Sequence, residues 1–154
     1  MRISSKTSIG IHIMLLVALY GDKCKLTGTI ISRSTGTNPV ITRNLLSDLQ
    51  RAGLIISTRG VGGTQLAKPL ETISIYDIFC ATDAESPKDI IAIHPNPNPN
   101  CPIGAIINDV LETPYTRINN AIAQVMKNER LIDLVDTVKK ARPNWIEVIK
   151  PVSK

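Results

Sequence analysis

The first apolar run of the chain, IGIHIMLLVALYG, predicts a buried first helix from Ser5 to Tyr20. Together with the charged start MRISSK, the run also resembles a secretory signal peptide. The segment that follows, DKCK, supplies no small-residue cleavage site, and the polar His12 interrupts the apolar run. A helix that spans a bilayer requires about 20 apolar residues, and this run is shorter. We therefore expect a helix of the folded domain and no contact with a membrane.

Two shorter helical patterns follow, separated by a turn that contains glycine. Thr27 is the predicted N-cap of a helix over residues 28–34, which the sequence TGT then breaks. Asn38 and Pro39 restart the helix, with a capping side chain followed by proline at the first helical position. Apolar positions at helical spacing continue over residues 39–52. Two helices joined by such a turn are typical of a helix-turn-helix, although an ordinary helical hairpin shows the same pattern.

Two short β-branched segments, residues 54–58 and 64–67, predict a two-stranded hairpin behind the third helix. The sequence RGVGG lies between them. A glycine-rich loop that binds a dinucleotide must open a helix, but only five residues separate Gly63 from Pro69. A Walker loop would need Gly-Lys-Ser or Gly-Lys-Thr, which this loop lacks. The glycines therefore predict a hairpin tip, and a helix-turn-helix followed by a hairpin is a winged helix.

A capping box predicts a fourth helix, and a linker follows it. Ser74 and Asp77 have the spacing of the capping box, and Cys80 on this helix is expected to be a small core residue. The later sequence HPNPNPNCP cannot be helical and predicts an extended, semi-rigid linker. His94 and Cys101 in it resemble a base and a nucleophile, but no orienting group or oxyanion donor is identified beside them. A hinge or a thiol switch is the favoured interpretation.

A long apolar stripe in the last third of the chain predicts a dimerisation helix. Apolar residues from Ile103 to Met126 recur at the helical period of about 3.6 residues, and Pro114 inside the stripe predicts a kink or a break. This is more apolar surface than a small winged-helix domain can cover, so we expect it to pair with the same helix of a second subunit. A further amphipathic helix over residues 129–140 is expected to pack back on its own domain. The predicted dimer contacts are Ile103, Ile107, Val110, Leu111, Ile118, Ile122 and Val125.

Charge is unevenly distributed along the 154 residues, whose formal net charge is +5. Residues 1–68 contain nine basic and two acidic side chains, whereas residues 69–154 contain nine basic and eleven acidic ones. The first half is therefore strongly basic and the second half slightly acidic. We expect a polyanion to bind the first half.

The three cysteines, Cys24, Cys80 and Cys101, cannot all pair within one chain, and none lies in a C-x-x-C motif. This usage favours a reducing compartment, so we expect a cytoplasmic protein. Cys24 lies between Lys23 and Lys25, whose charges would favour its thiolate. Cys24 and Cys101 are the candidate sensor residues, with a solvated loop cysteine without a role as the alternative for Cys24.

The segments MRISSK, NPVITRNLLSDLQRAGLIISTRGVGG and ISIYDIFCA together resemble the Rrf2 family of bacterial transcription regulators. The resemblance covers residues 1–81, and HPNPNPNCPIG resembles the hinge before the long helix in one branch of the family. It implies a dimeric winged-helix DNA-binding protein, often a repressor that senses iron–sulfur status, nitric oxide, thiols or metabolites. The wing is one residue shorter than the usual triple-glycine form and lacks its aromatic residue.

Cluster-binding members of that family have three cysteines between the fourth helix and the long helix. Here residues 82–104 contain only Cys101, and Gly104 replaces a histidine that some members have. An iron–sulfur cluster needs about four ligands, most of them thiolates. We therefore expect no metal and no other cofactor in one chain, and the alternative is a cluster whose ligands two subunits share.

The family's usual docking places the N-terminal part of the third helix in the major groove of DNA. Arg43 can bond guanine in bidentate fashion, and Asn44 can do the same with adenine. Each of these side chains could equally be a solvated polar group of the surface. The predicted base-reading residues are Asn38, Val40, Thr42, Arg43 and Asn44.

The remaining predicted DNA contacts are to the backbone and the minor groove. Lys6, Thr27 and Thr37 are assigned to phosphates. Arg59 in the wing suits a narrow minor groove, and Gly60 would let the backbone approach closely.

The predicted fold class is mainly α with a small β-hairpin, as a winged helix-turn-helix domain plus a long dimerisation helix. The predicted parts are a DNA-binding domain at 1–82, a linker or sensor loop at 83–102, dimerisation helices at 103–141 and a tail at 142–154. The expected function is that of a homodimeric regulator, not an enzyme, which binds a palindromic operator in double-stranded DNA and represses in response to a redox, thiol or metabolite signal. The alternatives are a winged-helix module for protein interaction, and a thiol redox sensor or enzyme without specific DNA binding.

Overall fold

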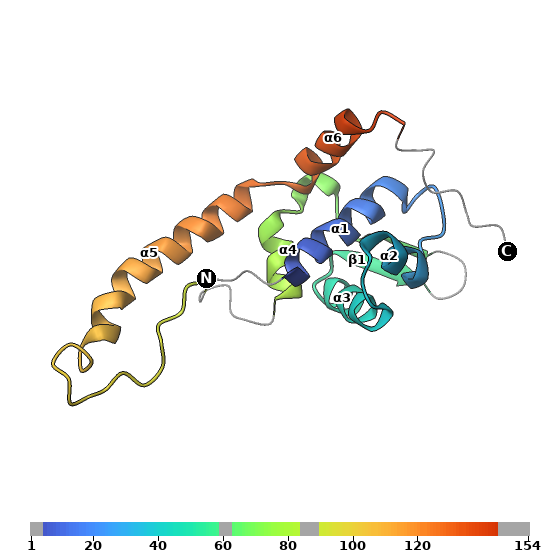
Figure 1. The fold of residues 1–154 in the computed structure, drawn as a ribbon. Coiled ribbons are helices and arrows are strands. Elements are labelled where there is room, and N and C mark those ends of the chain that lie inside the picture. The colour runs from blue at the N-terminus through green and yellow to red at the C-terminus, as the bar shows by residue number, and fades with distance from the viewer. Residues whose placement is uncertain (1–4, 59–62, 84–89, 145–154) are drawn as a thin grey trace.

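The chain is mainly helical, with one antiparallel hairpin, in a computed structural model that describes residues 5–58, 63–83 and 90–144 (Figure 1). This is the predicted fold class. The elements are α1 (Ser5–Tyr20), α2 (Gly28–Thr35), α3 (Pro39–Arg51), β1 (Ile55–Thr58), β2 (Gly63–Leu66), the 3-10 turn η1 (Leu70–Thr72), α4 (Ile75–Thr82), α5 (Ile107–Asn128) and α6 (Leu131–Ala141).

Helix α1 is the centre of the core. It is apolar around most of its circumference, and its buried side chains include Ile13, Met14 and Val17. Helices α2, α3, α4 and α6 and strand β2 all pack against it. Gly10 permits the close approach of α4, because a Cβ at this position would lie 2.7 Å from Thr82 Cγ2. No helix in the described parts of the chain is long and apolar enough to cross a membrane.

The helix-turn-helix has the predicted caps. The Thr27 hydroxyl accepts a hydrogen bond from the Ile30 amide at 3.3 Å, and the Asn38 side chain accepts one from the Val40 amide at 2.8 Å. Each bond satisfies an amide that the first helical turn leaves without an intrahelical partner. Between the two helices Gly36 has a φ of 65°, the left-handed conformation that ends α2. Helix α2 extends to residue 35, one residue beyond the prediction.

Strands β1 and β2 form the predicted hairpin directly behind α3. They pair in antiparallel register, from Ile55 opposite Leu66 to Thr58 opposite Gly63. Leu54 and Ile55 are buried, which fixes the hairpin to the core. The tip of the hairpin, including Arg59 and Gly60, lies outside the described residues.

Helix α4 begins at the predicted capping box. The Ser74 hydroxyl accepts a hydrogen bond from the Asp77 amide, and the Asp77 carboxylate accepts one from the Ser74 amide. The prediction that Cys80 is a core residue is wrong, because its side chain is exposed. Ile78 and Phe79 occupy the inward face of this two-turn helix instead.

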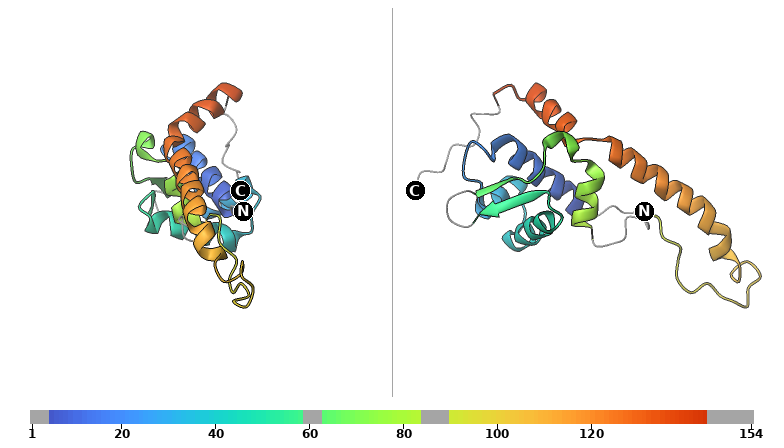
Figure 2. Two further views of the ribbon diagram at one scale, coloured as in Figure 1. Left: turned by 90° about the vertical axis from the view of Figure 1, so that its left-hand side faces the viewer. Right: turned by 180° about the vertical axis from the view of Figure 1, so that it is seen from behind.

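The segment between α5 and α6 is bonded to the start of α4, and this junction connects both helices to the winged-helix body. The Ile75 amide donates to the Glu129 carbonyl, and the Leu131 amide donates to the Ile73 carbonyl, both at 2.9 Å. Helix α6 then packs back on α1 and buries Leu131 and Val135, as predicted. The right-hand view in Figure 2 shows α5 extending away from this junction.

Helix α5 continues through Pro114, so a break at this point is not found. Proline removes the hydrogen bond that its own amide would donate to the Val110 carbonyl, and its ring crowds that carbonyl. Val110 is 56% exposed, which leaves water able to reach this turn of the helix. The helix begins at Ile107, four residues after the predicted start, because residues 101–106 form a series of turns.

Candidate nucleic-acid interface

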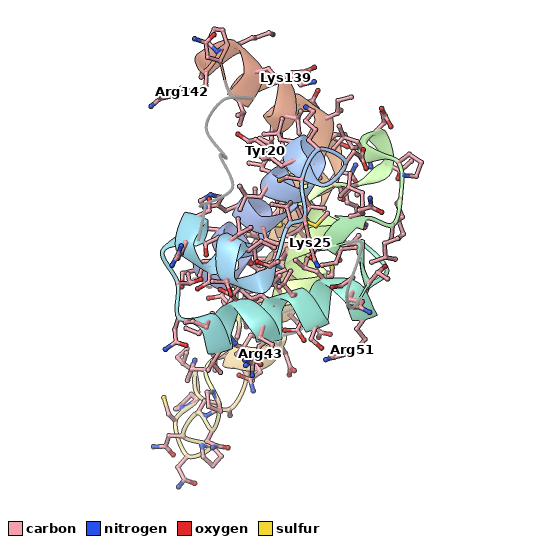
Figure 3. All side chains as sticks on the ribbon, turned by 90° about the vertical axis from the view of Figure 1, so that its right-hand side faces the viewer. Tyr20, Lys25, Arg43, Arg51, Lys139 and Arg142 are labelled. Carbon is pink, nitrogen blue, oxygen red and sulfur yellow. The ribbon has the colours of Figure 1, made fainter. Side chains whose placement is uncertain are left out.

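The outward face of α3 is the first candidate functional surface. Asn38, Val40, Arg43 and Asn44 are all exposed, and Val40 is 56% accessible. Figure 3 shows Arg43 and Arg51 on α3, at the edge of the body. A helix that offers a cation, an amide and an apolar side chain along one face can bond base edges and contact a thymine methyl group.

The opposite face of α3 holds the helix rigidly. Leu45 and Leu49 are buried in the core, and α3 also packs on α2, α4 and β1. The Asn38 cap and Pro39 at the first helical position fix where the helix begins. The exposed face is therefore presented by a fixed support, which a site that recognises a defined sequence requires.

A chain of threonine hydroxyls ties the turn between α2 and α3 together. Thr35 donates to the Ile31 carbonyl at 2.9 Å, so its proton is used. The bond of 2.7 Å between the Thr35 and Thr37 hydroxyls must therefore use the Thr37 proton. The bond of 2.8 Å between Thr37 and Thr42 then uses the Thr42 proton. The three side chains form one directed relay that ends on α2.

This relay involves two of the predicted DNA contacts. Thr42 is 1% exposed, so its side chain offers almost no surface to a base in this structure. Thr37 is half-buried and gives its hydroxyl proton to Thr35, and its contact with a phosphate stays a prediction. Both residues position α3 relative to α2.

An open hollow lies between the start of α1 and the length of α3. Its volume is about 330 Å³, and it contains the predicted phosphate contact Lys6. Asn44 also lines it, so the structure brings these two predicted residues together. The Thr27 hydroxyl accepts from the Ile30 amide and keeps its own proton to donate. The full lining of the hollow is Lys6, Ile41, Asn44, Leu45, Ser47, Asp48 and Arg51.

Two polar residues of this hollow, Ser47 and Arg51, were missed by the sequence-based prediction. Both are exposed, and Arg51 forms an ion pair of 3.2 Å with Asp48. The signal was present in the sequence, because positions 44, 47 and 51 have the spacing of one helical face. The predicted base contacts lie only in the first turns of α3.

The apolar stripe of α5 is the second candidate surface. Ile118 is 41% exposed, Val125 is 61% exposed, and Ile103 is exposed in the turns before the helix. Ile107, Leu111 and Ile122 are half-buried. A shallow apolar hollow of about 360 Å³ lies along Ala121, Ile122, Val125 and Met126. The stripe is therefore uncovered within one chain over much of its length.

Asn119 fixes the linker to the middle of α5. It is the one buried residue among those described in this helix, and its side chain bonds both backbone groups of Ile91. The Ile91 amide donates to Asn119 Oδ1 at 2.9 Å, and Asn119 Nδ2 donates to the Ile91 carbonyl at 3.3 Å. The linker over residues 94–98 is not helical, as predicted.

The three cysteines lie in different environments. Cys24 is half-buried and packs against the core, in the loop between α1 and α2. On α4, partial burial of the Cys80 sulfur raises the pKa of this thiol, although a hydrogen bond with Tyr76 lowers it. Cys101 is exposed, and hydrogen bonds with the Gly104 and Ile103 backbone lower the pKa of its thiol. Of the two exposed thiols, Cys101 has the more accessible thiolate.

The described residues do not fit an iron–sulfur cluster within one chain. Cys24, Cys80 and Cys101 lie in a loop of the body, on α4 and in the turns at the far end of α5 (Figure 1). Among the residues that the structure describes, no group of three or more His, Cys, Asp or Glu side chains could hold a metal ion.

Comparisons with known proteins point to one family of transcription regulators. Residues 3–137 match the Rrf2 family, which is described as an iron-dependent transcriptional regulator. The Bacillus subtilis protein YwnA, named as a candidate HTH-type transcriptional regulator, is 31% identical over 134 residues, which are 87% of this chain and 97% of YwnA.

Solved structures share the fold. The oxidized form of Staphylococcus aureus CymR has a TM-score of 0.65 and 26% identity, over 88% of this chain and 97% of CymR. T. potens IscR has a TM-score of 0.68 over 92% of this chain and 91% of IscR, and its 20% identity supports the fold alone.

Proposed function

Because this chain belongs to the Rrf2 family of transcription regulators, we propose that it acts as a homodimer that binds a palindromic operator. The family consists of transcription regulators and not of enzymes. The chain is therefore a transcription regulator, and the proposal concerns its assembly, its DNA contacts and its signal. We assign it to the cytoplasm of a bacterial cell, where its proposed DNA target lies.

The observation that carries the proposal is the supported, polar face of α3. Leu45 and Leu49 anchor the helix, while Arg43 and Asn44 project from its exposed side. In the major groove Arg43 bonds guanine O6 and N7, and Asn44 bonds adenine N6 and N7. Asn38 and Val40 at the start of the helix complete the base-reading set. The wing residues Arg59 and Gly60 remain proposed contacts to the minor groove.

Dimerisation through α5 follows from the exposure of its apolar stripe. Pairing two copies would cover Ile107, Val110 and Ile118 with the same residues of the second copy, as a two-fold interface does. The two α3 helices would then read symmetric half-sites. In helix-turn-helix dimers such half-sites are about one helical turn of DNA apart, or a multiple of it.

We assign repression to this dimer and the signal to its exposed or half-buried thiols. Cys101, with its lowered thiol pKa, and Cys24, in the loop before α2, are the candidate residues. The related CymR of Staphylococcus aureus has been solved in an oxidized form, which supports a redox signal. A modified Cys101 would act through the linker that Asn119 holds on α5.

The experiment is selection of binding sites from random duplex DNA, with and without reductant. Wild-type protein should enrich one palindromic sequence. Arg43→Ala should bind that sequence about 1–3 kcal/mol more weakly and lose preference at one base pair in each half-site. Arg142→Ala, which removes the same charge from the far end of the body (Figure 3), should keep the wild-type preference.

Absence of any enriched sequence with wild-type protein would contradict the proposal and favour a protein-interaction module. Equal losses for Arg43→Ala and Arg142→Ala would show that α3 does not read bases.

A further inference from the structure

We propose that the hollow between α1 and α3 binds one phosphate of the DNA backbone, held between Lys6 and Arg51. This inference rests on the proposed function, because it assigns the position of the DNA strand beside the recognition helix. It adds Arg51 and Ser47 to the contacts, and it gives Asp48 an opposing role.

The geometry of the hollow places two cations on walls from different helices. Lys6 is exposed in the first turn of α1, whereas Arg51 ends α3 with 75% of its side chain exposed. Ser47 lies one helical turn before Arg51 and supplies a hydroxyl that can donate. The two cations against the Asp48 carboxylate give the hollow a net positive charge.

These groups favour a phosphate of a long polymer over a small ligand. Guanidinium and ammonium groups with a hydroxyl are the side chains that contact DNA phosphates. The hollow runs along α3 from Ile41 to Arg51 and is open to solvent, so a strand could pass through it without ending there. Ile41, 44% exposed, provides an apolar wall for a sugar.

The position of Arg51 agrees with the dimensions of DNA. Asn44 and Arg51 are seven positions apart, which corresponds to about 10 Å along a helix axis. The major groove of B-DNA is about 12 Å wide. When Asn44 faces a base edge, Arg51 can therefore reach the strand that borders the groove.

Asp48 works against anion binding at this site. Its carboxylate lines the hollow and is paired with Arg51 at 3.2 Å. A bound phosphate would be repelled by Asp48 and would share the Arg51 guanidinium with it. Removal of this one negative charge should therefore strengthen DNA binding instead of weakening it.

The test compares charge removals at the hollow with matched removals elsewhere. Lys6→Gln and Arg51→Gln should each weaken binding to operator and scrambled duplex alike, by roughly fivefold near 0.1 M salt. Each should reduce the salt slope of the dimer by about two, one for the phosphate in each half-site. The controls are Lys139→Gln and Arg142→Gln on the far side of the body (Figure 3), where Lys139 also pairs with an aspartate three residues away. If the control variants lose as much DNA affinity as the hollow variants, the inference is wrong.

A second arm locates the phosphate. Duplexes are made with a single neutral methylphosphonate at successive backbone positions of each half-site. A methylphosphonate at one position should weaken binding by the wild-type protein. The same substitution should cause no further loss of affinity in the Lys6→Gln, Arg51→Gln double variant. Independent, additive losses at every position would overturn the assignment.

Two further measurements complete the test. Asp48→Asn should bind operator about threefold more tightly at the same salt, since it removes one like charge beside the phosphate. Weaker binding by this variant would count against an anion in the hollow.

Inorganic phosphate should compete with the duplex no better than chloride at equal ionic strength, and specific competition would reassign the hollow to a free anion. If Arg43→Ala loses base preference while the hollow variants bind DNA as their controls do, the proposed function survives and this inference fails.

Discussion

Helices α1 and α5 are both long and rich in apolar residues, but they use these residues differently. Helix α1 has 16 residues, of which eight are buried, whereas α5 has 22 residues and buries only Asn119. Apolar residues surround α1 and lie in one stripe along α5. The first pattern needs a core on all sides, and the second needs one partner surface. Helix α1 is therefore covered within the chain, whereas the stripe of α5 is left uncovered, and we propose that a second chain covers it.

Contacts of α5 with its own body are concentrated at one end. Near that end the Lys127 ammonium lies 4.8 Å from the centre of the Tyr76 ring on α4, and the Glu129 carbonyl accepts from the Ile75 amide at 2.9 Å. The other end of α5 extends away from the body with the linker beside it (Figure 1). A charge introduced into the stripe should therefore affect assembly before it affects folding.

The largest expected effect is on stability, from a change within α1. Ile13→Ala removes a fully buried side chain and should lower the free energy of unfolding by about 2–5 kcal/mol. Ile56→Ala makes the same chemical change at a side chain that is 50% exposed, and it should cost far less. Urea denaturation of both variants measures the difference. Equal losses would show that α1 is not the centre of the core.

The next effect is on assembly, from a change within α5. Ile118→Asp places one carboxylate from each chain in the proposed apolar contact and should give folded monomers. Thr116→Asp adds the same charge two residues away, on a different face of the helix, and should leave dimers. Sedimentation velocity gives the mass, and circular dichroism confirms the fold. If Ile118→Asp forms dimers to the same extent as the wild-type protein, α5 is not the dimer interface.

The smallest effect is chemical and concerns the two exposed thiols. Backbone hydrogen bonds lower the pKa of Cys101, whereas partial burial raises the pKa of Cys80. Because the thiolate is the reactive form, Cys101 should be alkylated faster at neutral pH, and its rate should begin to rise at a lower pH. Mass spectrometry after iodoacetamide treatment at a series of pH values measures both rates in the same chain. Faster alkylation of Cys80 at neutral pH would reverse the assignment.

Elements with a local signal could be predicted from the sequence alone. The caps at Thr27 and Asn38 and the capping box at Ser74 lie within a few residues of the amides that they satisfy, so they fix where α2, α3 and α4 begin. The stripe of α5 likewise follows from periodicity alone. Local pattern and local structure agree at these points.

Features that depend on contacts between elements could not be predicted in the same way. In the sequence Thr42 is an ordinary polar residue of a helix, and only the fold of the turn brings the Thr37 hydroxyl within 2.8 Å of its own. Cys80 is exposed because Ile78 and Phe79 take the inward positions of α4. The hollow joins Lys6 to Arg51 across 45 positions of the sequence, through the packing of α1 on α3.

The central claim is that two copies of this chain bind one operator through their α3 helices. The most direct test is sedimentation of wild-type protein mixed with the selected duplex, with protein and DNA detected separately. We expect a complex of two chains on one duplex, which a duplex with a single half-site does not form at the same concentration. One chain bound per duplex, with equal affinity for one and two half-sites, would contradict it.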